Sequence, residues 1–248
     1  MKLTDEVYLV GGGNFGFGLS GELDCHIYAI DGGDEIALVD CGMGDGAAID
    51  EIVANLKEDG LDPGRVRKLL LTHYHADHAG GASLMVEKLH LGVYASPVAA
   101  QALRVADEKA TGLDIGKAAG FYQQSYHLRP CPIEAELVEG QMVSVGRLRL
   151  SVFDTPGHCN GHVSFVMQGS SRRYFFGGDL VFFGGRIILQ NIPDCNIQAY
   201  AQSVFKLEDQ NLDVFLPGHA AISLRYGQRH IDAAAAAFRN LMVPPNLL

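Results

Sequence analysis

The chain has 248 residues and a formal net charge of −10, with 48% apolar and 19% charged residues. This composition is typical of a globular protein that is large enough to bury a core. An acidic chain is a poor nucleic-acid binder because phosphate contacts need clustered lysine and arginine. No apolar run approaches the ~18 residues of a transmembrane helix. We therefore expect neither a nucleic-acid nor a membrane partner.

The cysteines indicate a reducing compartment. They are odd in number, widely scattered and form no CxxC pair, and the N-terminal stretch MKLTDEVYLVGGG lacks the long apolar region of a signal peptide. A cytoplasmic protein with reduced thiols is the prediction, although a leader could be absent from this sequence. The cysteines are Cys25, Cys41, Cys131, Cys159 and Cys195.

The first half of the chain alternates β-rich runs with helical patterns. Gly and Asp separate the opening runs, which is typical of a meander. Gly60 follows a helical pattern and predicts its end. In order, we predict strands at 8–10, 25–30 and 35–40, a helix at 47–58, a strand at 67–73, a helix at 82–90 and a strand at 92–96.

Residues 97–127 have helical spacing that is broken by Gly112, Gly116 and Gly120, which predicts a helical insert at about 97–130. No low-complexity segment or linker interrupts the chain, so a single domain over 1–248 is expected. The element order favours an α/β fold, a four-layer αββα sandwich of two mixed β-sheets flanked by helices. The second half adds predicted strands at 148–155, 162–168 and 173–179, a helix at 196–207, a strand at 213–219 and a helix at 228–241.

The stretch LTHYHADHAGG, residues 71–81, concentrates metal-binding side chains behind a strand-like run. His73 and His75 project to the same side of an extended segment, and a turn would bring Asp77 and His78 back toward them. Imidazole and carboxylate suit Zn²⁺, Fe or Mn²⁺. The alternative is a polar loop with incidental histidines, but three of the chain's 10 histidines in six positions favour a metal site.

Further ligands are expected at other strand ends, where apolar runs meet glycine-rich turns. FDTPGHCNGH offers His158 and His162, YFFGGD offers Asp179, and VFLPGH offers His219. Each alone is more typical of a loop residue. Their order and context together predict that they complete the site.

HxHxDH followed by TPGH, GGD and PGH resembles the metallo-β-lactamase fold superfamily, in particular its glyoxalase II and lactonase-like branch. The resemblance runs from the LVDCG turn at Asp40 to His219. It implies the αββα fold and a centre of two Zn²⁺ ions, with Mn²⁺ or Fe as alternatives. An Asp at the bridging position makes antibiotic hydrolysis less expected. The implied ligands are His73, His75 and His158 for one metal, Asp77, His78 and His219 for the second, and Asp179 as the bridge.

The implied chemistry is hydrolysis by a metal-bridging hydroxide. Two metals about 3.5 to 4 Å apart share a water whose pKa falls to about 7, so hydroxide forms at neutral pH. It would attack a small ester, lactone or thioester, and Asp77 could receive the released proton. Phosphodiester or phosphotriester hydrolysis is an alternative, as are a mononuclear iron oxygenase of persulfide-dioxygenase type and a non-catalytic relative.

Comparison within the superfamily narrows the substrate. Glyoxalase II adds a C-terminal helical region for glutathione, and only 29 residues follow His219 here, so glutathione thioesters are disfavoured. Acyl-homoserine lactonases place a tyrosine three residues after the bridging Asp, where this chain has Phe182. Phenylalanine has no hydroxyl, so another residue would have to supply it. Tyr122 and Tyr126 in the insert are the candidate catalytic hydroxyls.

The expected roles of several other residues are as follows. We expect His162 to be structural and His26 to be a satisfied core histidine, while Asp40 either orients a ligand or caps its turn. Phe15 and Phe17, with the insert, are candidate lids over a small-molecule substrate. Arg186 is expected either to bind a substrate carboxylate or to pair with Asp194. The sequence is also compatible with a homodimer.

Overall fold

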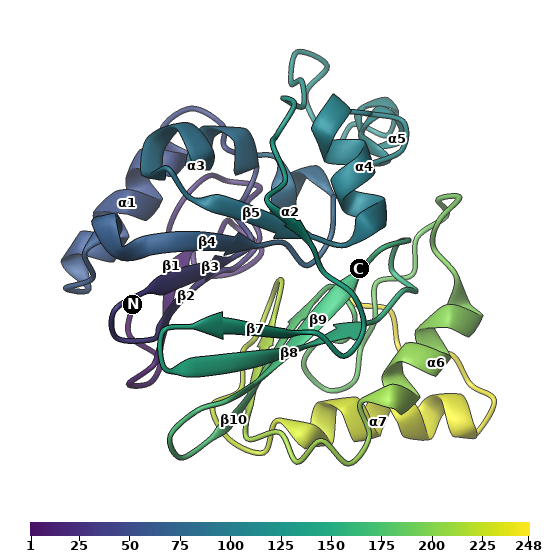
Figure 1. Cartoon of the computed structure of the whole chain (residues 1–248). Coiled ribbons are helices and arrows are strands. Elements are labelled where there is room, and N and C mark those ends of the chain that lie inside the picture. The colour runs from purple at the N-terminus through teal and green to yellow at the C-terminus, as the bar shows by residue number, and fades with distance from the viewer. The chain divides into compact units, whose positions relative to one another are not determined.

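The computed structural model describes residues 1–248. They divide into two compact units, Met1–Leu137 and Val138–Leu248, and each unit has one β-sheet with helices packed against it (Figure 1). The single-domain organisation stays a prediction. None of the helices is long and apolar enough to cross a membrane.

The sheet of the first unit has the strand order β1-β2-β3-β4-β5-β6. β1 to β3 are antiparallel neighbours, whereas β3 to β6 run parallel, so the sheet is mixed. Parallel neighbours end at the same edge, which gathers the loops that follow them. The strands are β1 (Val7–Gly11), β2 (Ile27–Asp31), β3 (Ile36–Val39), β4 (Val66–Leu70), β5 (Gly92–Ala95) and β6 (Ala135–Glu136).

Helices connect these strands. In α1 the buried residues Ile49, Ile52, Val53 and Leu56 form one apolar stripe, and the helix ends just before Gly60, whose φ is 76°. Burial of this stripe against the sheet, rather than helix propensity, stabilises a helix of this length. The helices are α1 (Ala48–Glu58), α2 (Ala76–Ala79), α3 (Ala82–Leu89), α4 (Pro97–Val105) and α5 (Leu113–Ala118), with the 3₁₀ turn η1 (Pro63–Arg65).

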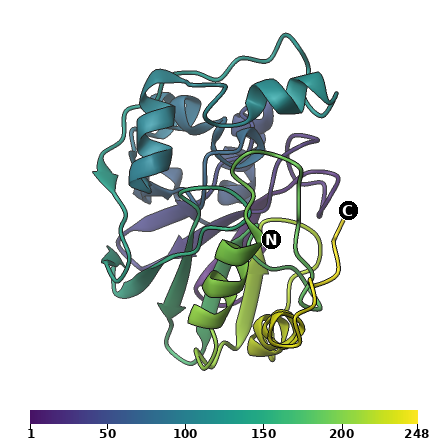
Figure 2. The same ribbon diagram turned by 90° about the vertical axis from the view of Figure 1, so that its right-hand side faces the viewer.

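The sheet of the second unit has the order β11-β10-β9-β8-β7 and is also mixed, because only β10 and β11 are parallel. α6 and α7 lie side by side (Figures 1 and 2), and their buried residues share one apolar core with Phe175 and Phe215 of the sheet. The elements are β7 (Met142–Val145), β8 (Leu148–Asp154), β9 (Val163–Gln168), β10 (Arg173–Gly178), α6 (Ile197–Lys206), β11 (Val214–Pro217) and α7 (Gln228–Arg239).

Most predicted elements are present, with three differences. The strand predicted at 67–73 ends at Leu70, so the histidine segment lies beyond the sheet. Four short elements were not predicted: α2, η1, β6, which has two residues, and β7, a half-exposed hairpin partner of β8. The insert is helical only in α4 and α5, and Gly116 lies inside α5 rather than breaking it.

His230 of α7 makes the stability of this fold depend on pH. Its Nδ1 accepts a hydrogen bond from the Gly184 amide at 3.0 Å, which requires a neutral ring. Burial, helped by the charge of Arg229, lowers the pKa of His230 to about 4. The unfolded state therefore binds the proton more readily than the folded state between pH ~6.5 and ~4.

We expect the free energy of unfolding to be highest above pH ~6.5 with respect to this group and to fall by about 2 kcal/mol as the pH approaches 4.5. Urea unfolding at several pH values would measure it. His230→Gln should flatten this part of the pH dependence, since glutamine accepts the same hydrogen bond without titrating. Parallel curves for the two proteins would contradict the assignment.

Candidate metal-binding site

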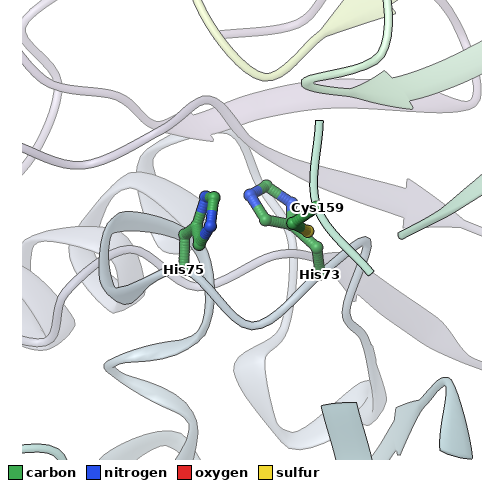
Figure 3. Close-up of side chains that lie close together, drawn as sticks. All are labelled: His73, His75 and Cys159. Carbon is green, nitrogen blue, oxygen red and sulfur yellow. The ribbon is translucent and has the colours of Figure 1, made fainter. Parts of the chain in front are cut away.

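The first unit brings its four predicted ligands onto one short segment after β4. The segment after β4 is irregular up to His75, whose backbone is extended with φ −61° and ψ 149°, and α2 then turns Asp77 and His78 back. The rings of His73 and His75 lie 4.7 Å apart in an edge-on arrangement. Figure 3 shows these two side chains close together. The rings of His73 and His78 are 4.0 Å apart. The clustering that the spacing predicts is therefore present.

Two neighbouring side chains fix the orientation of these histidines. Asp40 is buried, and its Oδ2 accepts a hydrogen bond from His78 Nδ1 at 2.9 Å and from Thr72 Oγ1 at 2.8 Å. Thr72 Oγ1 also lies 3.0 Å from His73 Nδ1. Engaging Nδ1 presents Nε2 of each ring as the ligand atom. The orienting hydrogen bond expected of Asp40 is thus present.

Asp77 divides its two carboxylate oxygens between different neighbours. Oδ1 accepts a hydrogen bond from the Tyr122 hydroxyl at 2.9 Å, and Oδ2 lies 3.6 Å from His78 Nε2. Two ligand atoms on one tetrahedral zinc ion, with bonds of about 2.1 Å, lie about 3.4 Å apart. The Oδ2 to Nε2 distance therefore suits a shared metal better than a direct hydrogen bond.

Tyr126, the second tyrosine predicted to act in catalysis, has a different environment. Its hydroxyl donates to the Met43 carbonyl at 3.0 Å, and burial raises the pKa of this phenol well above its usual range. The hydroxyl proton of Tyr126 is therefore engaged in a hydrogen bond to the backbone. The catalytic role of Tyr126 stays a prediction. Tyr122 contacts a predicted ligand instead.

The second unit gathers the other predicted ligands at the ends of its strands. β10 and β11 are parallel, and the Gly218 amide donates to the Gly178 carbonyl at 2.7 Å, which places Asp179 and His219 side by side. Asp179 Oδ2 lies 3.6 Å from His158 Nε2 and 3.7 Å from His219 Nε2. One carboxylate oxygen thus faces two imidazole nitrogens at distances suited to metal coordination.

The backbone around Asp179 is held by buried polar groups. The Asp179 amide donates to His162 Nε2 at 3.1 Å, and His162 Nδ1 lies 2.9 Å from Thr155 Oγ1. The Tyr200 hydroxyl donates to the Asp179 carbonyl at 3.0 Å. His162 therefore uses both ring nitrogens in the protein, which confirms the structural role expected of it.

Gly157 is required by the approach of α6 to the turn that carries His158. Its φ is 151°, and a Cβ at this position would lie 2.6 Å from the Cα of Tyr200. The Asn196 amide also donates to the Gly157 carbonyl at 2.8 Å, so α6 begins directly against this turn. The glycine of TPGH therefore allows α6 to pack directly on this turn, and this packing fixes the position of the neighbouring His158.

The remaining candidates lie elsewhere or have other partners. His26 is buried with Nδ1 3.1 Å from the Tyr28 hydroxyl, which agrees with a core histidine. Phe182 is fully buried, so it cannot stand in for a substrate-contacting tyrosine. The Arg186 guanidinium donates to the Asn246 carbonyl at 3.0 Å, a partner that neither predicted role included.

Phe15 and Phe17 are 43% and 46% exposed, as lid residues would be, but their loop is tied down by the Asn14 amide, which donates to the Glu22 carbonyl. The Phe17 ring also lies 5.5 Å from that of His26. The lid function stays a prediction.

The donors of both units fit metal ions. Each unit supplies buried imidazoles next to a carboxylate, at separations of 3.6 to 3.7 Å, and zinc prefers this mixture of ligands. Oriented Nδ1 atoms in the first unit and a braced Asp179 in the second add the supporting hydrogen bonds typical of metal sites. Thr72, Thr155 and Tyr200 were missed by sequence reasoning because a lone hydroxyl residue carries no motif.

Comparisons with known proteins agree with this chemistry. Residues 20–219 match the model of the metallo-beta-lactamase superfamily. An atrochrysone carboxyl ACP thioesterase of Aspergillus fumigatus is 29% identical over 89% of this chain and 58% of its own length. An acyl-coenzyme A thioesterase of Gallus gallus is 27% identical over 78% of this chain and 72% of its own length. The chain thus spans less than two thirds of the Aspergillus protein.

Among solved structures, a metallo-beta-lactamase of Cronobacter sakazakii superposes with a TM-score of 0.72 at 20% identity, over 97% of this chain and 95% of the other. At this identity the likeness concerns the fold alone. It confirms the prediction of an α/β sandwich of two mixed sheets flanked by helices.

Proposed function

Because the chain belongs to the metallo-beta-lactamase superfamily, we propose that it is a metal-dependent hydrolase of a thioester or a related small ester or lactone. The observation that carries the proposal is Asp179, whose Oδ2 lies 3.6 and 3.7 Å from two histidine nitrogens. A carboxylate in this position suits a ligand that is shared between two ions. Zinc is the metal proposed, with Mn²⁺ or Fe as alternatives.

The dinuclear site that we propose is the one implied by the family's ligand motifs. Seven donors suffice for two ions of four or five ligands when one donor is shared and water or substrate completes each shell. When bound, such a metal pair activates water and polarises the scissile carbonyl. The proposed ligands are His73, His75, Asp77, His78, His158, Asp179 and His219.

This chain's own residues would do three things. Asp40 and Thr72 hold His78 and His73 in the tautomer that binds metal. Asp77, which is half-buried beside His78, would accept the proton that the attacking water loses. Asp179 supplies negative charge whose position is fixed by its backbone hydrogen bonds.

Thioesters head the proposed substrates because both relatives described above are thioesterases by name, and they match most of this chain. Exposed apolar side chains at Phe15, Phe17 and Phe121 offer contact for an acyl group, with exposed fractions of 43%, 46% and 64%. An acidic chain disfavours polyanionic nucleic acid. Phosphodiesters therefore come second as substrates.

Removal of metal tests the proposal. We expect elemental analysis of protein purified without chelators to find about two zinc ions per chain, and a strong chelator to abolish hydrolysis reversibly. Activity should return on addition of Zn²⁺ or Mn²⁺. Hydrolysis that persists in metal-free protein would contradict the proposal.

A substrate panel separates the alternatives. Acyl-coenzyme A and acyl-pantetheine thioesters, a homoserine lactone, bis-p-nitrophenyl phosphate and a glutathione persulfide should be assayed with the same preparation. Thioester hydrolysis with the highest kcat/KM is expected. One iron per chain with oxygen consumption on the persulfide would replace this proposal with the oxygenase alternative.

A further inference from the structure

The helical insert makes direct contact with the ligand segment of its own unit. The Tyr122 hydroxyl donates a hydrogen bond to Asp77 Oδ1 at 2.9 Å. Asp77 Oδ2, the other oxygen, lies 3.6 Å from His78 Nε2. The insert therefore engages the carboxylate oxygen that points away from the neighbouring histidine.

The position of the Tyr122 ring is fixed by a glycine in α5. A Cβ on Gly116 would lie 2.6 Å from Cδ2 and 2.7 Å from Cε2 of Tyr122, so the ring packs directly on the helix backbone. Glycine inside a helix costs roughly 0.5 to 1 kcal/mol relative to alanine. Close packing of the Tyr122 ring therefore explains why a glycine, which is unfavourable in a helix, occupies position 116.

The insert is also clamped on both sides of Tyr122. Glu108 accepts hydrogen bonds from Lys117 Nζ at 2.6 Å and from the Leu128 amide at 3.3 Å. Lys117 is buried at the end of α5. This partly buried ion pair closes the loop that carries Tyr122, so the hydroxyl projects from a braced segment.

We propose that Tyr122 is a positioning residue that sets the orientation of Asp77 and thereby couples the conformation of the insert to metal binding. The inference rests on the proposed function, because it takes Asp77 as a metal ligand. With Oδ1 engaged by the phenol, Asp77 presents Oδ2 alone and need not lose rotational freedom when metal binds. By thermodynamic linkage, metal binding in turn stabilises the docked insert.

Zinc affinity is the direct test, measured by competition with a chromophoric chelator on metal-stripped protein. Tyr122→Phe should weaken zinc binding about 10-fold, the lower end of the effect of hydrogen-bond partners of metal ligands. Gly116→Ala should do the same, because its methyl group displaces a ring that still carries its hydroxyl. Tyr126→Phe is the matched control, since it removes an equivalent hydroxyl that binds the Met43 carbonyl. The zinc affinity of Tyr126→Phe should stay within about twofold of the wild-type value.

A spectroscopic measurement separates positioning from a general loss of structure. The chain has no tryptophan, so tyrosine absorption is not masked. Zinc added to wild-type or Tyr126→Phe protein should give a tyrosine difference spectrum, because charge on the carboxylate that Tyr122 contacts is neutralised. The difference spectrum should be lost in Tyr122→Phe.

Three results would overturn the inference. They are wild-type zinc affinity in Tyr122→Phe, an equal loss of affinity in Tyr126→Phe, and an unchanged difference spectrum in Tyr122→Phe. Each of these leaves the proposed function intact as long as the wild type binds zinc and hydrolyses a substrate of the panel. A wild-type protein that binds no metal would instead overturn both proposals.

Discussion

Asp179→Asn is expected to lower kcat/KM by about 10³-fold, which corresponds to about 4 kcal/mol of lost transition-state stabilisation. Asp179 Oδ2 faces His158 and His219 at 3.6 and 3.7 Å, so the proposed shared ligand is one carboxylate oxygen. An asparagine has the same shape but is neutral. It would hold two dications together poorly, and the metal content should fall with the activity.

The measurement is kcat/KM for the best substrate of the panel, together with zinc per chain. Asp232→Asn is the matched control, since it makes the same chemical change on an exposed face of α7 and should retain wild-type kinetics. Circular dichroism should show both variants folded, because the amide of residue 179 still donates to His162. Full activity in Asp179→Asn with normal zinc content would exclude the shared-ligand role.

The ligand candidates could be predicted from the sequence because their chemistry is concentrated in short motifs at strand ends. His73, His75, Asp77 and His78 lie within six positions, and a strand-like run before them fixes where they start. Asp179 and His219 could be paired in advance only through the family resemblance. The parallel pairing of β10 with β11, which places them together, depends on contacts far apart in the chain.

The supporting residues could not be predicted in the same way. Tyr122 contacts Asp77 across 45 positions of sequence, and only the packing of its ring on Gly116 decides that it does so. Gly116 was read as a helix breaker, which is its usual local effect, but it lies inside α5. Short β6 and half-polar β7 carry too weak a pattern to stand out, since their strand conformation comes from their partners.

Asp40→Ala is expected to lower the free energy of unfolding by about 3 kcal/mol and to weaken zinc binding between about 10-fold and 100-fold. The buried carboxylate accepts three hydrogen bonds, at 2.7 and 2.8 Å from Thr72 and 2.9 Å from His78. Their loss leaves buried donors without acceptors. The residue also has φ 60°, a conformation that costs alanine about 1 kcal/mol.

Asp40→Asn separates the two effects. Asparagine adopts the left-handed conformation readily and its Oδ1 can still accept from the Thr72 amide, so most of the stability should be retained. Its amide group, however, donates toward His78 Nδ1 where the carboxylate accepted. The imidazole must then carry its proton on Nε2, the atom proposed to bind metal, so zinc affinity should fall nearly as far as in the alanine variant. Wild-type zinc affinity in Asp40→Asn would show that Asp40 supports only the turn, and that the tautomer of His78 is set by the metal itself.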